Sequence, residues 1–186
     1  ALRDSFFQVS SIITTTGYTT VDFDKWPTFS KMILFTLMFI GGCAGSTAGG
    51  IKNIRIVVLL KAIKREFYRI LHPRAVIPIK IDGKVISNNT IAGISSFFAL
   101  FIFIFIISTM IVSLDGVDFE SAASAVAATL GNVGPAFGFA GPLRSYSGFS
   151  NLSKIVMSIC MLLGRLEIFT LMILFNPEIW KYEAFT

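Results

Sequence analysis

Two short glycine-containing segments carry residue types that could replace the water around a cation. Residues 15–18 read TTGY, with two β-branched residues before a glycine, and residues 132–135 read NVGP, a looser version of the same pattern. A pore that passes a bare cation substitutes backbone carbonyl oxygens for the hydration shell. Consecutive carbonyls can point the same way only if one residue adopts a conformation that a Cβ disfavours, and glycine permits this. Each segment is therefore either an ion-coordinating turn or an ordinary turn.

A glycine-rich segment, GGCAGSTAGG at residues 41–50, interrupts an apolar run. Five glycines in ten residues disfavour a continuous helix, because each costs about 1 kcal/mol relative to alanine. Gly41, Gly45 and Gly49 also have the spacing of small residues at a close helix–helix contact. The segment is expected to be either such a packing surface or a break that exposes carbonyls and rearranges at low cost.

Two enzymatic interpretations of the same segment fail on its residues. Gly45 and Gly50 have the spacing of a phosphate-binding loop, but Ile51 stands where that motif requires lysine. A serine hydrolase using Ser46 would need a base. The chain has one histidine, His72, and it lies in a separate basic stretch.

Composition places the chain in a membrane rather than in water. It has 186 residues, of which 54% are hydrophobic and 15% charged, with a mean hydropathy of +0.74. A soluble domain carries roughly a quarter charged residues, so a soluble enzyme, a disordered chain and a disulfide-rich secreted protein are all disfavoured. Cys43 and Cys160 lie in apolar segments and are expected to be buried free thiols. The net charge of +5 indicates cytoplasmic membrane loops rather than nucleic-acid binding.

Three apolar windows are expected to cross the membrane, since a spanning helix needs about 20 apolar residues. The windows are residues 32–51, 85–114 and 155–176. The segments 1–29 and 115–150 are too weakly apolar to span, and each begins with a short helical stretch. Helices of about 10–14 residues suggest re-entrant segments, whose irregular backbone is tolerated where it lines a water-filled path.

The charge distribution predicts the orientation. Residues 52–84 hold nine basic and two acidic residues, a net charge of +7, so the positive-inside rule places them in the cytoplasm. The segments 1–29 and 115–150 are then extracytoplasmic and the C-terminus cytoplasmic. Within the basic stretch we expect an amphipathic helix ending at Pro73 and a hairpin at Asp82-Gly83. The stretch is either a solvated loop or also a docking surface for a cytoplasmic partner.

The chain repeats itself. Ser30-Lys31 and the apolar run to Gly41 align with Ser153-Lys154 and the run to Gly164, at an offset of 123. The two glycine turns align at an offset of 117. Each unit is expected to contain a short helix, a glycine turn, an outer loop and an inward span, a kind of repeat common in transporters. The first unit lacks an opening helix, so we expect the chain to be a piece of a longer protein.

Arg165 lies near the middle of the last apolar window, where a charge costs at least about 2.5 kcal/mol and indicates a functional site. Glu167 follows at a spacing that places it on a different helix face, so we expect it to pair with another helix or a backbone amide. The repeat aligns Arg165 with Gly42. We therefore predict that Arg165 reaches carbonyls of the glycine-rich segment and places a positive charge near the ion path.

These features resemble the TrkH/KtrB family of potassium-transporter membrane subunits. The resemblance rests on FFQVSSIITTTGYTTVDFDKWP, GGCAGSTAGGIKNIR, ATLGNVGPAFG and GRLEIFTLMILF, which extend over nearly the whole chain. The family's pore has four units, so the resemblance implies most of the third and all of the fourth. It implies K⁺ uptake and no enzymatic activity. It leaves open whether K⁺ permeates passively or is coupled to H⁺ or Na⁺. The alternative is a non-conducting accessory or scaffolding membrane subunit.

The resemblance also implies the site residues. Carbonyls that would coordinate K⁺ in the filter belong to Thr15, Thr16, Gly17, Asn132, Val133 and Gly134. The residues that would form a gate below the filter are Gly41, Gly42, Gly45, Ser46, Thr47, Gly49, Gly50 and Arg165.

The expected fold is an all-α polytopic membrane protein of the cell inner membrane, built from helix–re-entrant loop–helix units as in potassium channels. Its parts would be the third unit (1–60), a cytoplasmic basic linker and hairpin (61–88), the fourth unit (89–176) and a cytoplasmic tail (177–186). Implied partners are membrane lipid, the remaining N-terminal half of the transporter, a second copy in a homodimer, and a cytoplasmic nucleotide-binding regulatory subunit of the RCK type. No cofactor is implied apart from the transported K⁺.

Overall fold

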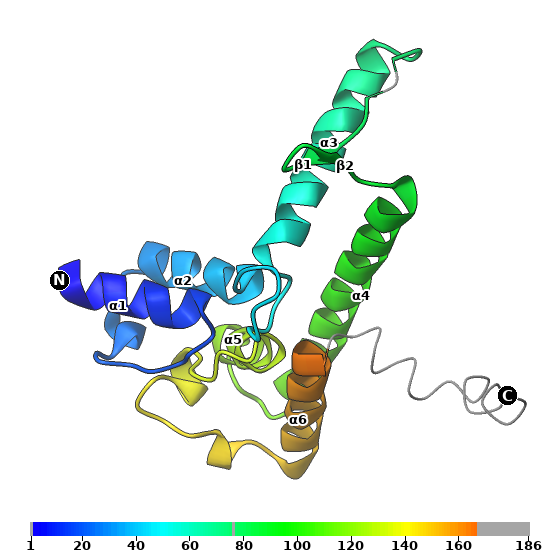
Figure 1. The fold of residues 1–186 in the computed structure, drawn as a ribbon. Coiled ribbons are helices and arrows are strands. Elements are labelled where there is room, and N and C mark those ends of the chain that lie inside the picture. Colours follow the sequence, from blue (N-terminus) through cyan, green and yellow to red (C-terminus); the bar gives the residue numbers. More distant parts are fainter. Residues whose placement is uncertain (1, 76, 167–186) are drawn as a thin grey trace, which may run out of the picture.

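The computed structural model describes residues 2–75 and 77–166, and this part of the chain is almost entirely helical (Figure 1). The β-structure in this part of the chain is a hairpin of two strands with two residues each. The helices are α1 (Leu2–Ile13), α2 (Thr28–Ile40), α3 (Asn53–Leu71), α4 (Asn88–Ser113), α5 (Phe119–Leu130) and α6 (Asn151–Leu166), and the strands are β1 (Lys80–Ile81) and β2 (Lys84–Val85). Three single-turn 3₁₀ helices lie in the loops at Phe23–Lys25, Gly138–Ala140 and Tyr146–Gly148.

Helix α5 is the centre of the molecule. It contacts α2, α4 and α6, and every residue from Ser121 to Leu130 is buried. Small side chains make this possible, because the sequence SAASAVAAT lets neighbouring helices approach closely. In Figure 1, α1 and α2 lie together on one side of α5, α6 lies on the other, and α3 and α4 extend away from this body as a pair.

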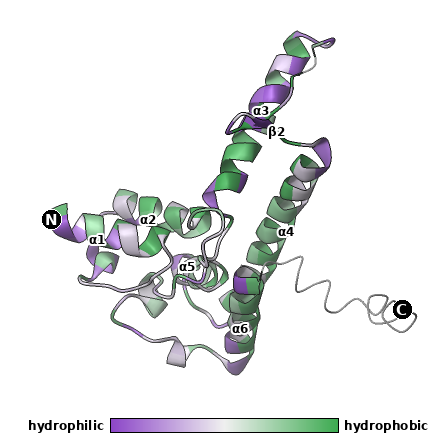
Figure 2. Ribbon diagram, in the orientation of Figure 1, coloured by the Kyte–Doolittle hydropathy of each residue, from purple (hydrophilic) through white to green (hydrophobic). Residues whose placement is uncertain are grey.

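Helix α4 is long and apolar enough to cross a membrane. Among the described residues it is the single helix that meets this criterion, and Figure 2 shows it hydrophobic along most of its length. Large apolar side chains such as Phe103 and Met110 are 60% and 66% exposed. This confirms one continuous helix over most of the apolar window at residues 85–114, capped at its start by the Ser87 hydroxyl, which accepts from the Thr90 N–H.

The apolar window at residues 32–51 is not one helix. Helix α2 ends at Ile40 after 13 residues, and Gly41 caps it with φ +67°. The interpretation of Gly41, Gly45 and Gly49 as a helix-packing surface is therefore wrong, because residues 41–52 are not helical and such spacing lines up only on a helix. The chain becomes helical again in α3, which alternates hydrophilic and hydrophobic residues (Figure 2).

The amphipathic helix and the hairpin in the basic stretch are confirmed. Helix α3 ends at Leu71, two residues before Pro73, consistent with the restriction that proline places on the preceding residue. Strands β1 and β2 pair antiparallel around Asp82 and Gly83, whose φ angles are +49° and +78°. This is the turn geometry that an Asp-Gly pair favours.

The sequence repeat is present in the helix boundaries. Helices α1 and α5 each have 12 residues and correspond at an offset of 117, while α2 and α6 begin at corresponding positions at an offset of 123. The repeat ends at Gly41 and Gly164, because α6 continues through Gly164 whereas α2 stops. The remainder of the third apolar window, with Glu167, lies outside the described residues, as does the tail at 177–186.

Candidate functional site

Residues 15–17 and 132–134 form two turns with the same backbone hydrogen bonds. In each turn the first N–H donates to the carbonyl three residues back, and the next two N–H groups share one carbonyl in the last turn of the preceding helix. The donor–acceptor distances are 3.0, 2.9 and 3.3 Å in the first turn and 3.1, 2.8 and 3.4 Å in the second. The sequence correspondence at an offset of 117 is therefore also a structural one.

Both turns contain two residues in the left-handed region rather than one. Gly17 and Gly134 have φ +78° and +105°, as their type permits, but Thr15 and Asn132 also have φ +55°. A non-glycine residue in this region costs roughly 1–2 kcal/mol. Sequence reasoning missed both positions. Asparagine is enriched at positive φ and gave a weak signal, whereas threonine is β-branched and gave none.

The carbonyls of the two turns are largely free. Over residues 2–75 and 77–166, the carbonyls of Thr15, Thr16, Gly17, Asn132 and Val133 accept no hydrogen bond. Five adjacent unsatisfied acceptors are a cost unless water or a cation supplies the missing partner. These carbonyls can therefore serve as cation ligands.

The far end of each turn is held by a side-chain hydroxyl that the sequence did not reveal. Ser11 Oγ donates to the Tyr18 carbonyl at 2.6 Å, and Tyr146 Oη donates to the Gly134 carbonyl at 2.6 Å. Tyr146 lies 12 residues after Gly134 in a loop, which is why no local pattern could have indicated the contact. Burial raises the pKa of Tyr146, so its hydroxyl stays protonated and remains a donor.

The two turns lie against each other. A Cβ added at Gly17 would be 2.1 Å from the Val133 carbonyl oxygen and 3.2 Å from Cδ of Pro135. Only glycine allows this approach at residue 17. By contrast, the space around Gly134 is open, with no atom within 4 Å of an added Cβ. The structure therefore brings the two sets of carbonyls to one place.

The glycine-rich segment forms a loop with a closed base and an open tip. At the base, the Ile51 N–H donates to the Phe39 carbonyl at 3.0 Å and the Asn53 N–H to the Gly42 carbonyl at 3.1 Å. Cys43 is exposed, so the expectation that both thiols are buried is wrong for Cys43 and holds for Cys160. The difference arises because Cys43 is in the loop tip, whereas Cys160 faces the helix core.

This loop packs on the backbone that leads into the second turn. An added Cβ at Gly49 would lie 2.3 Å from the Gly131 carbonyl oxygen, and one at Gly41 would lie 2.3 Å from the Gly49 carbonyl oxygen. Gly41, Gly49 and Gly50 are buried, while Gly45 at the tip has no neighbour within 4 Å of an added Cβ. Movement of the loop base is therefore coupled by contact to Gly131, next to the candidate cation ligands.

Arg165 contacts the loop as expected from the sequence repeat. Its Nη1 donates a hydrogen bond to the Thr47 carbonyl. Nearby, Asn132 Nδ2 donates to the Met161 carbonyl at 3.1 Å, so the end of α6 contacts both the loop and the second turn. Ser46 Oγ donates to the Cys43 carbonyl at 2.7 Å, so its hydroxyl proton is used in a hydrogen bond within the loop.

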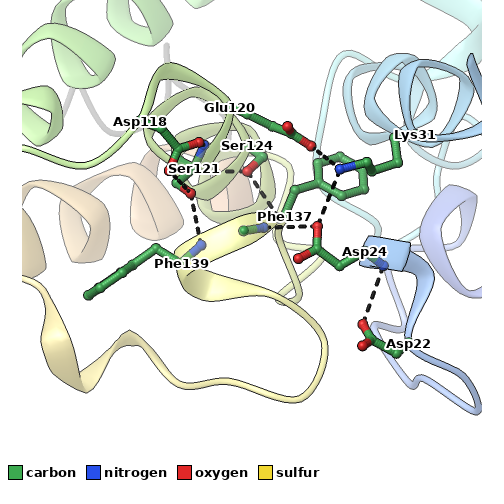
Figure 3. Close-up of polar contacts among 10 residues, drawn as sticks. Asp22, Asp24, Lys31, Asp118, Glu120, Ser121, Ser124, Phe137 and Phe139 are labelled. Carbon is green, nitrogen blue, oxygen red and sulfur yellow. Dashed lines mark hydrogen bonds and ion pairs between the residues drawn. The ribbon is translucent and has the colours of Figure 1, made fainter. Parts of the chain in front are cut away.

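A polar network joins the two units at the start of α2 and α5 (Figure 3). Lys31 Nζ lies 2.5 Å from Glu120 Oε1 and 3.5 Å from Asp24 Oδ1. Asp24 also accepts from the Gly138 N–H at 3.1 Å. The Lys31 side chain is only 18% exposed, so this ion pair is partly shielded from water and stabilises the contact between α2 and α5.

Helix α5 begins at a strong cap within this network. The Asp118 carboxylate accepts from the Ser121 hydroxyl at 2.7 Å and from the Ser121 N–H at 3.1 Å. These hydrogen bonds hold the pKa of the Asp118 carboxyl below its usual value, and the bond from the Ser121 hydroxyl has the larger effect. Figure 3 shows that Ser121 and Ser124 in turn accept from the backbone N–H groups of Phe139 and Phe137. The cap therefore also fixes the loop that follows the second turn.

A long apolar helix, a broken helix and two short helices that end in matched turns are features expected of a helical membrane protein of a transport class. The chain belongs to the TrkH family of cation transport proteins, whose sequence model matches residues 1–182.

Named relatives agree with this assignment. The Trk system potassium uptake protein TrkH of Halomonas elongata is 42% identical over 180 residues, which cover 97% of this chain and 37% of that protein. The Trk system potassium uptake protein TrkG of Escherichia coli is 36% identical over 177 residues, which cover 95% of this chain and 36% of that protein. The crystal structure of the potassium transporter TrkH from Vibrio parahaemolyticus superposes with a TM-score of 0.84 at 42% identity, covering 95% of this chain and 37% of that one. The chain therefore spans slightly more than a third of these relatives.

Proposed function

We propose that the chain supplies the third and fourth of four pore units in a membrane protein that takes up K⁺. The observation that carries this proposal is the pair of matched turns with free carbonyls at Thr15, Thr16, Gly17, Asn132 and Val133. Replacing the hydration shell of K⁺ requires such oxygens. Gly134 completes the proposed filter, and its carbonyl is oriented by Tyr146. The potassium-uptake names of the relatives support the choice of ion.

In this proposal α1 and α5 are pore helices that enter the membrane without crossing it, and α4 crosses it. Twelve residues at about 1.5 Å each give roughly 18 Å, too short for the roughly 30 Å hydrocarbon core. The basic residues between 52 and 84 face the cytoplasm, and the loops at 14–27 and 131–150 face outward. The C-terminus is then cytoplasmic, and the host membrane is the cell inner membrane.

The glycine-rich loop is proposed to obstruct the ion path below the filter. It is formed by Gly41, Gly42, Gly45, Ser46, Thr47, Gly49 and Gly50, and Arg165 holds it through the Thr47 carbonyl. The open tip allows the loop to move, whereas the buried base keeps it attached to Gly131. A positive charge beside the path adds an electrostatic barrier to cations.

The assembly proposed from the family resemblance includes the remaining N-terminal half, a second copy of the same protein and a cytoplasmic nucleotide-binding subunit of the RCK type. The third and fourth units correspond to residues 1–60 and 89–176. The basic segment between them, with exposed Lys64 and Lys84, is the surface proposed to meet the regulatory subunit. The chain itself is proposed to have no catalytic activity.

K⁺ flux by the full-length protein tests this proposal. Proteoliposomes should accumulate K⁺, and the variant with alanine at both Gly17 and Gly134 should insert but lose K⁺ selectivity or flux. A protein that inserts normally yet passes no K⁺ would instead be an accessory membrane subunit, and the proposed filter would be wrong. Wild-type selectivity in the double variant would remove the ion site from these turns.

A further inference from the structure

A basic cavity lies where α3 ends and α4 begins. Its volume is about 800 Å³, and three arginines from two segments line it. Arg65 and Arg69 are one turn apart on α3, which places them on the same face of the helix, and Arg74 follows in the turn after Pro73. The start of α4 closes the other side with Asn88 and Ile91. The described lining contains no acidic side chain.

The arginines are only partly neutralised. Glu66 lies 3.4 Å from Arg65 Nη2 and 3.5 Å from Arg69 Nη1, but it does not line this cavity and instead lines a neighbouring one. Arg74 has no ion pair among the described residues. The cavity therefore keeps a net positive charge, and it also faces the N-terminus of a 26-residue helix, which favours an anion.

Arg65 is held in place before any ligand binds. Its Nη1 donates to the Asn88 side-chain oxygen at 3.0 Å, which links α3 to the first turn of α4. A guanidinium that is already positioned loses little conformational freedom when it binds a phosphate. Arg69, whose side chain is 64% exposed and paired with the exposed Glu66, and Arg74 can reorient toward a ligand.

Apart from Ser87 and Asn88, the rest of the cavity wall is apolar. Ile79, Ile86 and Ile91 contribute to it, and Ile91 opens the apolar stretch of α4. Next to Arg69, the α3 side chains Ile70 and Leu71 are 76% and 72% exposed. A phosphate bound by the arginines would therefore lie at the polar end of a membrane-crossing helix, with apolar surface extending from the site toward the hydrocarbon.

We propose that this cavity binds the phosphate head group of an anionic phospholipid from the cytoplasmic leaflet. Basic cavities between membrane helices on this side recognise such head groups. A free phosphate or nucleotide would match the arginines but would leave the exposed apolar side chain of Val85, which lines the cavity, in contact with water, whereas the glycerol and first methylenes of a lipid would cover it. The proposal depends on the membrane location and not on which ion the protein carries.

Native mass spectrometry of the full-length protein tests the proposal. The protein is purified in neutral detergent and exposed to equal amounts of phosphatidylglycerol and phosphatidylcholine, and retained lipids are counted. We expect selective retention of phosphatidylglycerol. Arg69→Gln with Arg74→Gln should weaken that binding about 25-fold, about fivefold for each arginine, since a basic residue near an anionic surface contributes about 1 kcal/mol. Arg65 is left intact because it also holds α4.

Lys64→Gln with Lys84→Gln is the matched control. It removes the same charge from the same segment, but neither lysine lines the cavity. We expect its phosphatidylglycerol affinity to stay within about twofold of wild type, because exposed charges beyond the site are screened. Equal retention of the two lipids by the wild type, or equal loss in both variants, would overturn the proposal. Inorganic phosphate that binds as tightly as phosphatidylglycerol would show a free-anion site and overturn the lipid assignment.

Discussion

Replacing Gly17 by alanine should damage ion selectivity more than the equivalent change at Gly134. Both residues have positive φ, at +78° and +105°, so each variant carries backbone strain of roughly 1–2 kcal/mol. At residue 17 the new Cβ also lies 2.1 Å from the Val133 carbonyl oxygen, whereas at residue 134 no atom is within 4 Å. The two substitutions therefore carry similar backbone strain, but only Gly17→Ala also brings a Cβ into collision with the Val133 oxygen.

The collision acts on a proposed cation ligand. To reach ordinary van der Waals contact at 3.4 Å from 2.1 Å, the Val133 oxygen must withdraw by about 1.3 Å. Overpacking of this kind costs about 1–3 kcal/mol, giving roughly 2–5 kcal/mol in total for Gly17→Ala. If about 1.4 kcal/mol of this falls on K⁺ coordination alone, selectivity changes tenfold. We expect at least that loss.

The assay is uptake of K⁺ and Na⁺ by cells that lack other K⁺ uptake systems and express the full-length protein, with protein level measured by blotting. Gly116→Ala is the matched control, because Gly116 has φ +73° and no atom within 4 Å of an added Cβ, yet lies outside both turns. The Gly116→Ala variant should carry the same backbone strain and keep the wild-type preference for K⁺ over Na⁺. Wild-type K⁺ preference in Gly17→Ala, or equal damage in the control, would refute the reasoning.

Three further predictions concern residues around the two turns. Tyr146→Phe removes the donor to the Gly134 carbonyl and should lower K⁺ preference severalfold in the same uptake assay while leaving protein level unchanged. Arg165→Ala removes the charge and the hydrogen bond to the glycine-rich loop, so K⁺ flux in proteoliposomes should rise; unchanged flux would make Arg165 a structural charge. Lys31→Met leaves two carboxylates unpaired and should lower the free energy of unfolding by about 1–2 kcal/mol, between the values for exposed and buried pairs, with a matching fall in the thermal unfolding midpoint.

Local sequence rules were sufficient to predict helix α4, the hairpin and the end of helix α3. The charge-free run at residues 85–114 predicts α4, Asp82-Gly83 predicts the hairpin, and Pro73 predicts the end of α3 within two residues. These features depend on neighbours along the chain, so periodicity and turn residues were enough. The internal repeat also predicted one long-range contact, because it aligned Arg165 with the glycine-rich loop that Arg165 contacts.

Features that depend on distant residues were not predictable. Tyr146 has no sequence relation to Gly134, and the ion pair of Lys31 with Glu120 joins residues 89 positions apart. Thr15 adopts positive φ although β-branched residues disfavour it. Such a conformation persists only where the surrounding structure enforces it, and that enforcement comes from packing, which a single sequence does not display.

The difference between the two repeat copies connects the proposed gate to the proposed filter. At the aligned glycines, α2 stops at Gly41 while α6 continues through Gly164. In the first copy further glycines follow, which disfavour helix, whereas in the second copy Arg165 and Leu166 follow, which favour it. The intact helix thereby carries a guanidinium to a carbonyl that only the broken copy can offer, because helix formation would have occupied it. Restoring the helix in the first copy would therefore leave Arg165 without its acceptor, so the proposed gate needs both the break and the charge, and it contacts the proposed filter through Gly131.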